Sequence, residues 1–175
     1  SQPTSVTIGI NPVEVIRERI PIILKDNKFK SLKIKLGNPL GLDADKEMFN
    51  EVYKISKKYN VKLRVDANGG WDVNQTLEMM NWLSKREVDY IEQPLKEGDE
   101  SDLKYIFDRR KMPIYLDESC RYAKQIPLWA KYVDGINLKL MKCGGITVEK
   151  QIQIFFKKNN ITLAIAESCT GGEIA

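Results

Sequence analysis

The stretch that decides the fold is KLRVDANGG at residues 62–70, where a short β-rich run ends in an acid and a glycine turn follows. Two further β-rich runs also end in an acid, so that Asp66, Glu92 and Asp117 end three successive runs, 26 and 25 residues apart. A longer segment with apolar residues at helical spacing separates each run from the next. Such alternation with short loops predicts parallel strands joined by right-handed crossovers, in either an open doubly wound sheet or a (β/α) barrel.

The whole chain follows this alternation. The expected strands cover residues 4–10, 32–36, 62–66, 90–92, 113–117, 135–140 and 161–166. The expected helices cover residues 13–24, 45–59, 102–109, 125–131 and 146–158, together with a helix that Asn74 caps and that carries Leu77, Met80 and Leu83. Charged residues stand at the ends of several consecutive strands, which favours a barrel, because an open sheet concentrates its site at one switch point.

We therefore predict an α/β fold, a TIM-type (β/α) barrel truncated to about seven βα units, with residues 1–175 forming one incomplete barrel domain. A closed barrel of this kind takes eight strands and about 250 residues. The chain is accordingly expected to be a fragment of a longer protein.

Composition and charge argue against a membrane or a nucleic acid as the partner of this chain. The chain has 42% hydrophobic and 30% charged residues, and no run approaches the roughly 18 apolar residues of a membrane span. The N-terminus lacks the pattern of a secretory signal, so we expect a cytoplasmic protein with no membrane partner. The net charge is +4, and the lysines are scattered over expected helix faces. That distribution predicts a solvated surface and no nucleic-acid partner.

Histidine is absent from the chain. Its absence excludes Ser-His-Asp and Cys-His nucleophiles, His-containing zinc sites and acid–base catalysis by imidazole. Cys120, Cys143 and Cys169 are odd in number and form no CxxC pair, which argues against a disulfide framework or a thiolate metal site. Proton chemistry is left to carboxylates, lysines, tyrosines or thiols.

The three strand-terminal acids form a candidate metal site. Because the ends of neighbouring parallel strands lie together, Asp66, Glu92 and Asp117 are expected to converge, and buried carboxylates at such a point need a cation or protons. Oxygen ligands without His or Cys select a hard cation such as Mg²⁺ or Mn²⁺. The alternative is that each acid only caps the helix that follows its strand.

Lysines flank these acids in the strand order. Lys33 and Lys35 share one face of the second strand, since side chains alternate along a strand, and Lys139 lies in the sixth strand. Ammonium groups inside a barrel need anionic partners. They could serve an anionic substrate beside the metal, or lie partly exposed at the barrel mouth.

Five motifs together resemble those of the enolase superfamily, in its muconate-lactonising subgroup, and are most similar to those of dipeptide epimerases of the L-Ala-D/L-Glu type. The matching pieces are LKIKLG at 32–37, RVDANGGW at 64–71, IEQP at 91–94, LDES at 116–119 and INLKLMKCGG at 136–145. They stand in the order and spacing of that family and cover nearly the whole chain.

The resemblance implies that Asp66, Glu92 and Asp117 bind Mg²⁺ and that Lys35 and Lys139 form the acid/base pair, with Lys33 assisting electrostatically. It also implies a small carboxylate substrate, most simply a dipeptide, epimerised by proton removal on one face and return on the other. A metal makes such a proton removable by stabilising the charge that develops on the carboxylate. Succinylbenzoate synthase or muconate cycloisomerase chemistry, an inactive fragment, and assembly into a homo-oligomer remain open.

The sequence departs from the family pattern in places. The N-terminal capping domain and the last βα unit are absent from residues 1–175. The run ESCTGG at 167–172 contains the expected Glu167-Ser168 pair, but it also resembles the opening motif of nicotinamide-nucleotide amidases, in which the serine is a nucleophile.

Overall fold

A computed structural model describes residues 4–25, 29–138 and 164–165 of the chain. Within these residues, seven parallel strands pair in chain order, from β1 to β7. The strands are β1 (Thr4–Ile8), β2 (Phe29–Lys35), β3 (Lys62–Asp66), β4 (Val88–Glu92), β5 (Ile114–Leu116), β6 (Gly135–Leu138) and β7 (Ala164–Ile165). This sequential parallel order is that of a (β/α) barrel and differs from the order of a doubly wound sheet. The predicted fold class is confirmed.

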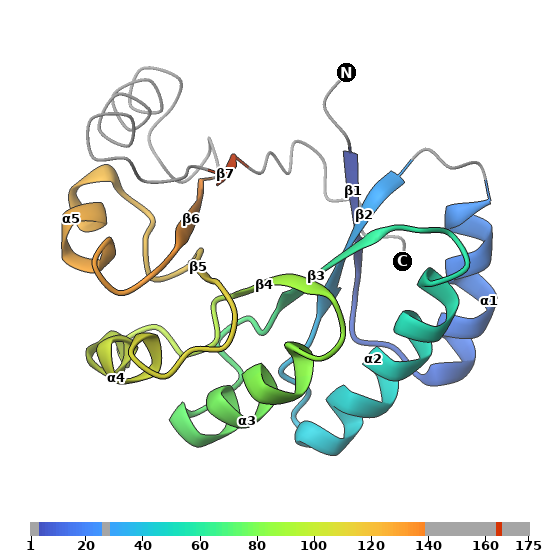
Figure 1. Cartoon of the computed structure of the whole chain (residues 1–175), viewed down its shortest axis with the longest axis horizontal. Helices are drawn as coiled ribbons and strands as arrows, with labels where there is room; N and C mark the ends of the chain where they lie inside the picture. The colour runs from blue at the N-terminus through green and yellow to red at the C-terminus, as the bar shows by residue number, and fades with distance from the viewer. Residues whose placement is uncertain (1–3, 26–28, 139–163, 166–175) are drawn as a thin grey trace.

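The helices lie outside the arc that the strands form (Figure 1). They are α1 (Val13–Leu24), α2 (Leu42–Ser56), α3 (Val73–Leu83), α4 (Leu103–Phe107) and α5 (Ile126–Trp129), with short 3₁₀ turns at Glu100–Asp102 and Ala123–Gln125. The apolar core fills the space between the two layers. Leu32, Ile34 and Val65 of the strands are fully buried there with Ile20 of α1 and Phe49 of α2.

Several element boundaries differ from expectation. The predicted cap Asn74 is wrong: Asp72 caps α3, where its side chain accepts the Gln75 N–H at 2.8 Å and the Gln75 side chain accepts the Asp72 N–H at 2.9 Å. This reciprocal capping box satisfies two otherwise unpaired N–H groups, which a cap at Asn74 would not do. The expected helix at 146–158, most of the predicted seventh strand and the run at 167–172 lie outside the described residues.

Polar and aromatic side chains occupy the inner face of the sheet. The rings of Tyr90 and Tyr115 stack with centroids 4.1 Å apart, and the Arg64 guanidinium lies 5.5 Å from the centroid of the Tyr90 ring. Gly135 leaves room for this stack, because a Cβ there would come within 2.6 Å of the Tyr115 ring. Tyr90 and Tyr115 stand two residues before Glu92 and Asp117, and side chains two residues apart on a strand share a face. The stack therefore lies next to the acids on the inner face.

The loops after β2 and β3 touch through two glycines. Gly37 has φ of +85°, and a Cβ on it would lie 2.3 Å from the Ala67 carbonyl oxygen and 3.1 Å from the Gly70 Cα. The buried Asp45 carboxylate reinforces the contact, because it accepts the N–H of Gly37 at 3.0 Å and the indole N–H of Trp71 at 3.0 Å. The two loops therefore act as one packed unit at the carboxyl end of the sheet.

This close approach predicts the effect of Gly37→Ala on stability. The new methyl group would force the backbones of the two loops apart, and the alanine would have to keep a positive φ. We expect the free energy of unfolding in urea to fall by at least about 2 kcal/mol. Gly98→Ala is the matched control, because Gly98 has φ of +106° in the turn closed by the Asp99 N–H on the Lys96 carbonyl, with nothing within 4 Å of its added Cβ. Its loss should stay near the roughly 1 kcal/mol of backbone strain, and equal losses in the two variants would contradict the packing argument.

Candidate active site at the carboxyl ends of the strands

The predicted acids of β3, β4 and β5 lie at one edge of the sheet. Asp66 and Glu92 are the last residues of β3 and β4, and Asp117 follows the last residue of β5. The strand register pairs Lys35 with Asp66 and Asp66 with Glu92. Asp66, Glu92 and Asp117 are buried, with 2%, 0% and 1% of their surface exposed. Three acids out of water at adjacent strand ends constitute a strongly electronegative site.

Lys33 joins two of these acids. Its ammonium nitrogen lies 3.1 Å from Asp66 Oδ2 and 2.7 Å from Glu92 Oε1. Burial of Lys33 disfavours its charge, but the attraction of Glu92 and Asp66 outweighs burial and raises the pKa of Lys33 above its ordinary value. Lys33 is therefore a fixed positive charge and is unsuited to removing a proton. Lys35 is half-buried at the end of β2, and its ammonium does not lie between the two carboxylates as that of Lys33 does.

The two carboxylate oxygens of Glu92 differ in their hydrogen bonds. Oε1 accepts from Lys33 Nζ and from the Asn137 amide at 2.7 Å, whereas Oε2 is buried and has no hydrogen-bond partner among the described residues. Burial raises the pKa of Glu92, opposed by Lys33 and supported by the negative charge of Asp66. Asn137 was not singled out from the sequence, although it stands two residues before Lys139 in the predicted strand at 135–140, where alternation predicts the same face for both.

The donors present fit a hard divalent cation in their chemistry. All are carboxylate oxygens, and the unpartnered Glu92 Oε2 is an orphaned buried acceptor of the kind a cation would satisfy. Within the described residues, however, no three Asp, Glu, Cys or His side chains are gathered as a group that could hold a metal ion. The structure pairs Asp66 with Glu92 around Lys33 and leaves Asp117 at the next strand end. The three-ligand set stays a prediction, as does the role of Lys139, which lies outside the described residues.

The chain belongs to the enolase C-terminal domain-like family, whose model matches residues 16–175. It is 57% identical over 182 residues to a hydrophobic dipeptide epimerase from a Flavobacteria bacterium (strain MS024-2A), across 97% of this chain and 52% of that protein. A second hydrophobic dipeptide epimerase, from Roseobacter litoralis, is 51% identical across 82% of this chain and 42% of its own length. The family predicted from the motifs is confirmed.

Solved structures agree with this assignment. The dipeptide epimerase from Enterococcus faecalis V583, complexed with Mg and the dipeptide L-Leu-L-Tyr, superposes with a TM-score of 0.83 at 31% identity, over 94% of this chain and 46% of that chain. The substrate-liganded L-Ala-D/L-Glu epimerase from Bacillus subtilis gives a TM-score of 0.85 at 26% identity, over 96% and 47% of the two chains. The chain spans about half the length of the relatives it matches.

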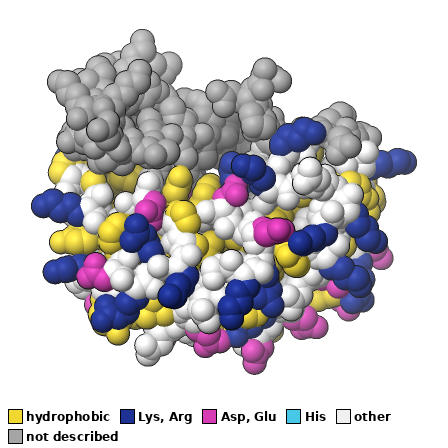
Figure 2. All heavy atoms as spheres, in the orientation of Figure 1, with side chains coloured by type: hydrophobic (Ala, Val, Ile, Leu, Met, Phe, Trp, Pro, Cys, Tyr) yellow, Lys and Arg dark blue, Asp and Glu magenta, His cyan; other side chains and the backbone are white. Residues whose placement is uncertain are grey.

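Basic and acidic side chains are mixed on the face of the molecule that Figure 2 shows. Figure 2 shows Lys and Arg side chains spread over the visible face with acidic side chains among them, and not gathered into one basic patch. Among the described residues, none of the helices has the length and apolar character required to cross a bilayer.

The position of Lys33 predicts a pH-dependent loss of stability in Lys33→Met. Methionine keeps most of the aliphatic stem but leaves Asp66 and Glu92 without their counter-charge. We expect the metal-free protein to lose about 3–5 kcal/mol of unfolding free energy at pH 7. Because the raised pKa of Glu92 makes the folded state take up a proton before the unfolded chain does, the deficit should shrink as the pH falls from 7 toward 5. The charge of Lys33, whose folded pKa is raised, stabilises the parent throughout this range and is lost only above the ordinary lysine pKa.

Urea denaturation at several pH values measures this effect. Lys46→Met is the matched control, because Lys46 pairs with the largely exposed Glu78 and its loss should cost no more than about 1 kcal/mol at any of these pH values. A deficit in Lys33→Met that equals the control, or that is constant with pH, would show that Lys33 does not neutralise the buried carboxylates.

Proposed function

We propose that this chain supplies the catalytic barrel of a Mg²⁺-dependent dipeptide epimerase. The observation that carries the proposal is the group at the ends of β2, β3 and β4, where Lys35 pairs in register with the buried Asp66 and Asp66 pairs with the buried Glu92, whose Oε2 has no hydrogen-bond partner in the described structure. The names of the two relatives at 57% and 51% identity support a hydrophobic dipeptide as substrate. Residues 1–175 then belong to one barrel domain of the enolase superfamily.

The proposed chemistry divides the work among the side chains. Asp66, Glu92 and Asp117 would hold Mg²⁺, which when bound would polarise the substrate carboxylate and acidify the neighbouring C–H. Lys35 would move a proton on one face of that carbon and Lys139 on the other, which inverts the stereocentre. Lys33 keeps its charge in this scheme and lowers the cost of assembling the carboxylates before the substrate arrives.

Further features bear on the setting of the protein. Cys120 is a buried free thiol, and burial raises its pKa to about 12, so it is a poor nucleophile. Disulfides persist mainly in oxidising compartments. The three cysteines are odd in number and form no CxxC pair, and this pattern supports our proposal of a cytoplasmic location. We propose a small-molecule carboxylate as the partner of the site; assembly into a homo-oligomer remains a prediction.

Metal binding tests the ligand set directly. Glu92→Gln replaces the unpartnered carboxylate oxygen with a neutral amide of the same size, so we expect calorimetry on the intact protein to show Mg²⁺ binding weakened by at least about tenfold. Glu78→Gln makes the same chemical change at a largely exposed position and should leave the affinity unchanged. Undiminished Mg²⁺ binding in Glu92→Gln would remove Glu92 from the metal site.

The two-lysine assignment predicts a particular pattern of proton exchange. Lys35→Ala and Lys139→Ala should each reduce epimerisation of a dipeptide such as L-Leu-L-Tyr by about 10²–10⁴-fold. With one lysine left, exchange of the α-proton with solvent deuterium should persist for one stereoisomer only, which proton NMR in D₂O measures. Lys30→Ala, at an exposed position of the same strand, is the control and should behave as the parent. If either site variant interconverts both isomers at the parental rate, the assignment is wrong.

A further inference from the structure

Gln93 is held in a conformation that its residue type disfavours. It follows Glu92 directly, has φ of +40°, and exposes only 1% of its surface. A non-glycine residue in the left-handed region costs on the order of 1 kcal/mol or more, and such strain persists only where the surroundings enforce it. Glycine would adopt this backbone at little cost. The glutamine side chain must therefore contribute something that glycine cannot.

The main chain of Gln93 links the ends of three strands. Its N–H donates to the carbonyl of Tyr115 in β5 at 2.8 Å, and its carbonyl accepts the N–H of Gly69, in the loop after β3, at 2.8 Å. The first bond continues the ladder between β4 and β5 by one residue beyond Glu92, and the second ties the loop after β3 to the same residue. The loops that follow Asp66 and Glu92 are consequently joined to the strand that precedes Asp117.

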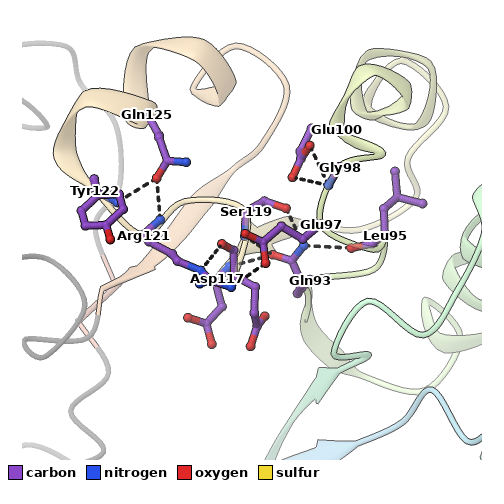
Figure 3. A network of polar contacts seen from close by, with 11 residues as sticks. Gln93, Leu95, Glu97, Gly98, Glu100, Asp117, Ser119, Arg121, Tyr122 and Gln125 are labelled. Carbon is purple, nitrogen blue, oxygen red and sulfur yellow. Dashed lines mark hydrogen bonds and ion pairs between the residues drawn. The ribbon is translucent and has the colours of Figure 1, made fainter.

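The side-chain amide of Gln93 completes this link, at the centre of the network in Figure 3. Nε2 donates to the Leu95 carbonyl at 2.8 Å and to Ser119 Oγ at 2.7 Å, while Oε1 accepts the N–H of Asp117 at 3.1 Å and of Ser119 at 3.2 Å. A primary amide has two donor hydrogens and two acceptor lone pairs. Every hydrogen-bonding position of the amide is therefore used, and three of the four bonds cross from the β4 loop to the β5 loop.

We propose that Gln93 is a positioning residue that sets the spacing between Glu92 and Asp117, and thereby the affinity of the site for a divalent cation. The effect on cation affinity rests on the proposed function. Glu92 is bonded to Gln93 through the chain, and Asp117 is bonded to the Gln93 amide through its own N–H. A shift of the β5 loop relative to β4 would therefore break the amide bonds before it could move the two carboxylates apart. Groups that orient metal ligands in this way alter metal affinity without touching the metal.

The experiment compares two variants of Gln93 in the intact protein, with two readouts. Gln93→Met keeps the length of the side chain and removes all four hydrogen bonds. Gln93→Gly removes the same bonds but relieves the backbone strain, which offsets part of the lost stability. This second variant can therefore be measured if Gln93→Met folds poorly. Calorimetry with Mg²⁺ or Mn²⁺ gives the dissociation constant, and hydrogen exchange of the metal-free protein reports on the N–H groups of Asp117 and Ser119.

Both Gln93 variants should weaken binding of the cation by at least about tenfold. Exchange at the Asp117 and Ser119 amides should rise by about tenfold or more without metal, because each loses its acceptor. Thr76→Val removes a part-buried hydrogen bond of 2.7 Å from the Thr76 hydroxyl to the carbonyl of Asp72, the N-cap of α3. Asn60→Gly relieves a φ of +50° at an exposed turn at the other end of β3. Neither control should change cation affinity or exchange at these amides.

The outcomes separate this proposal from the proposed function. If a folded Gln93 variant binds the cation within about threefold of the parent, or keeps parental exchange at Asp117 and Ser119, the positioning role is overturned, since outer partners of ligands otherwise contribute tenfold or more. If the parent itself binds neither Mg²⁺ nor Mn²⁺, the proposed metal function fails. Faster exchange in the variants would then still support the role of Gln93 in spacing the two loops, and unchanged exchange would refute it.

Discussion

The ammonium of Lys33 lies between two buried carboxylates, and the rest of the site depends on that arrangement. Without it, Asp66 and Glu92 would face each other out of water, where like charges repel strongly and each ion has lost its hydration. With it, the group keeps one net negative charge, to which Asp117 adds a second. We propose that a divalent cation neutralises this residual charge. The same lysine that permits the fold to bury the acids thus leaves a net negative charge for the proposed cation.

The carboxyl end of the sheet is held together mainly by contacts between loops. Gly37 packs against the loop after β3, Asp45 bonds the loop after β2 to Trp71, and Gln93 bonds the loop after β4 to that after β5. Each connection joins one strand end to the next around the arc. The spacing of the acids at the strand ends therefore depends on how these loops pack against one another.

Beneath the acids, the inner face of the sheet is aromatic. Burial raises the pKa of Tyr90, and the negative charge of Glu92 adds to that effect, so the phenol stays neutral beside the acids. Burial likewise raises the pKa of Tyr115, on which Tyr90 stacks. The acids are thus supported by rings that add no further negative charge, while the Arg64 guanidinium beside Tyr90 provides a positive one. Glu92 and Tyr90 occupy successive inward positions of β4, so the stacked tyrosines lie directly next to the acids along the strand.

Local sequence determined much of this protein. The alternation of strand and helix signals predicted the sequential parallel barrel, and its spacing placed three acids at adjacent strand ends, because each βα unit returns the chain to the same edge. The period of two in β2 placed Lys33 and Lys35 on one face. Where local signals competed, prediction failed: Asn74 and Asp72 are both good caps, and the choice depended on the Gln75 side chain completing the capping box.

Tertiary structure alone decided how these groups are paired. Lys33 meets Glu92 across 59 residues, Asn137 meets Glu92 across 45, and Gln93 meets Asp117 across 24. No periodicity or spacing within one segment reports such contacts, because each depends on the stagger of neighbouring strands and on the path of the loops between them. The sequence by itself determined which edge of the sheet carries the charged residues. Only the folded structure decided that one lysine bridges two acids and that one Glu92 oxygen is left without a partner in the described structure. It also decided that a strained glutamine joins the loops. These features follow from burial and packing around the whole sheet.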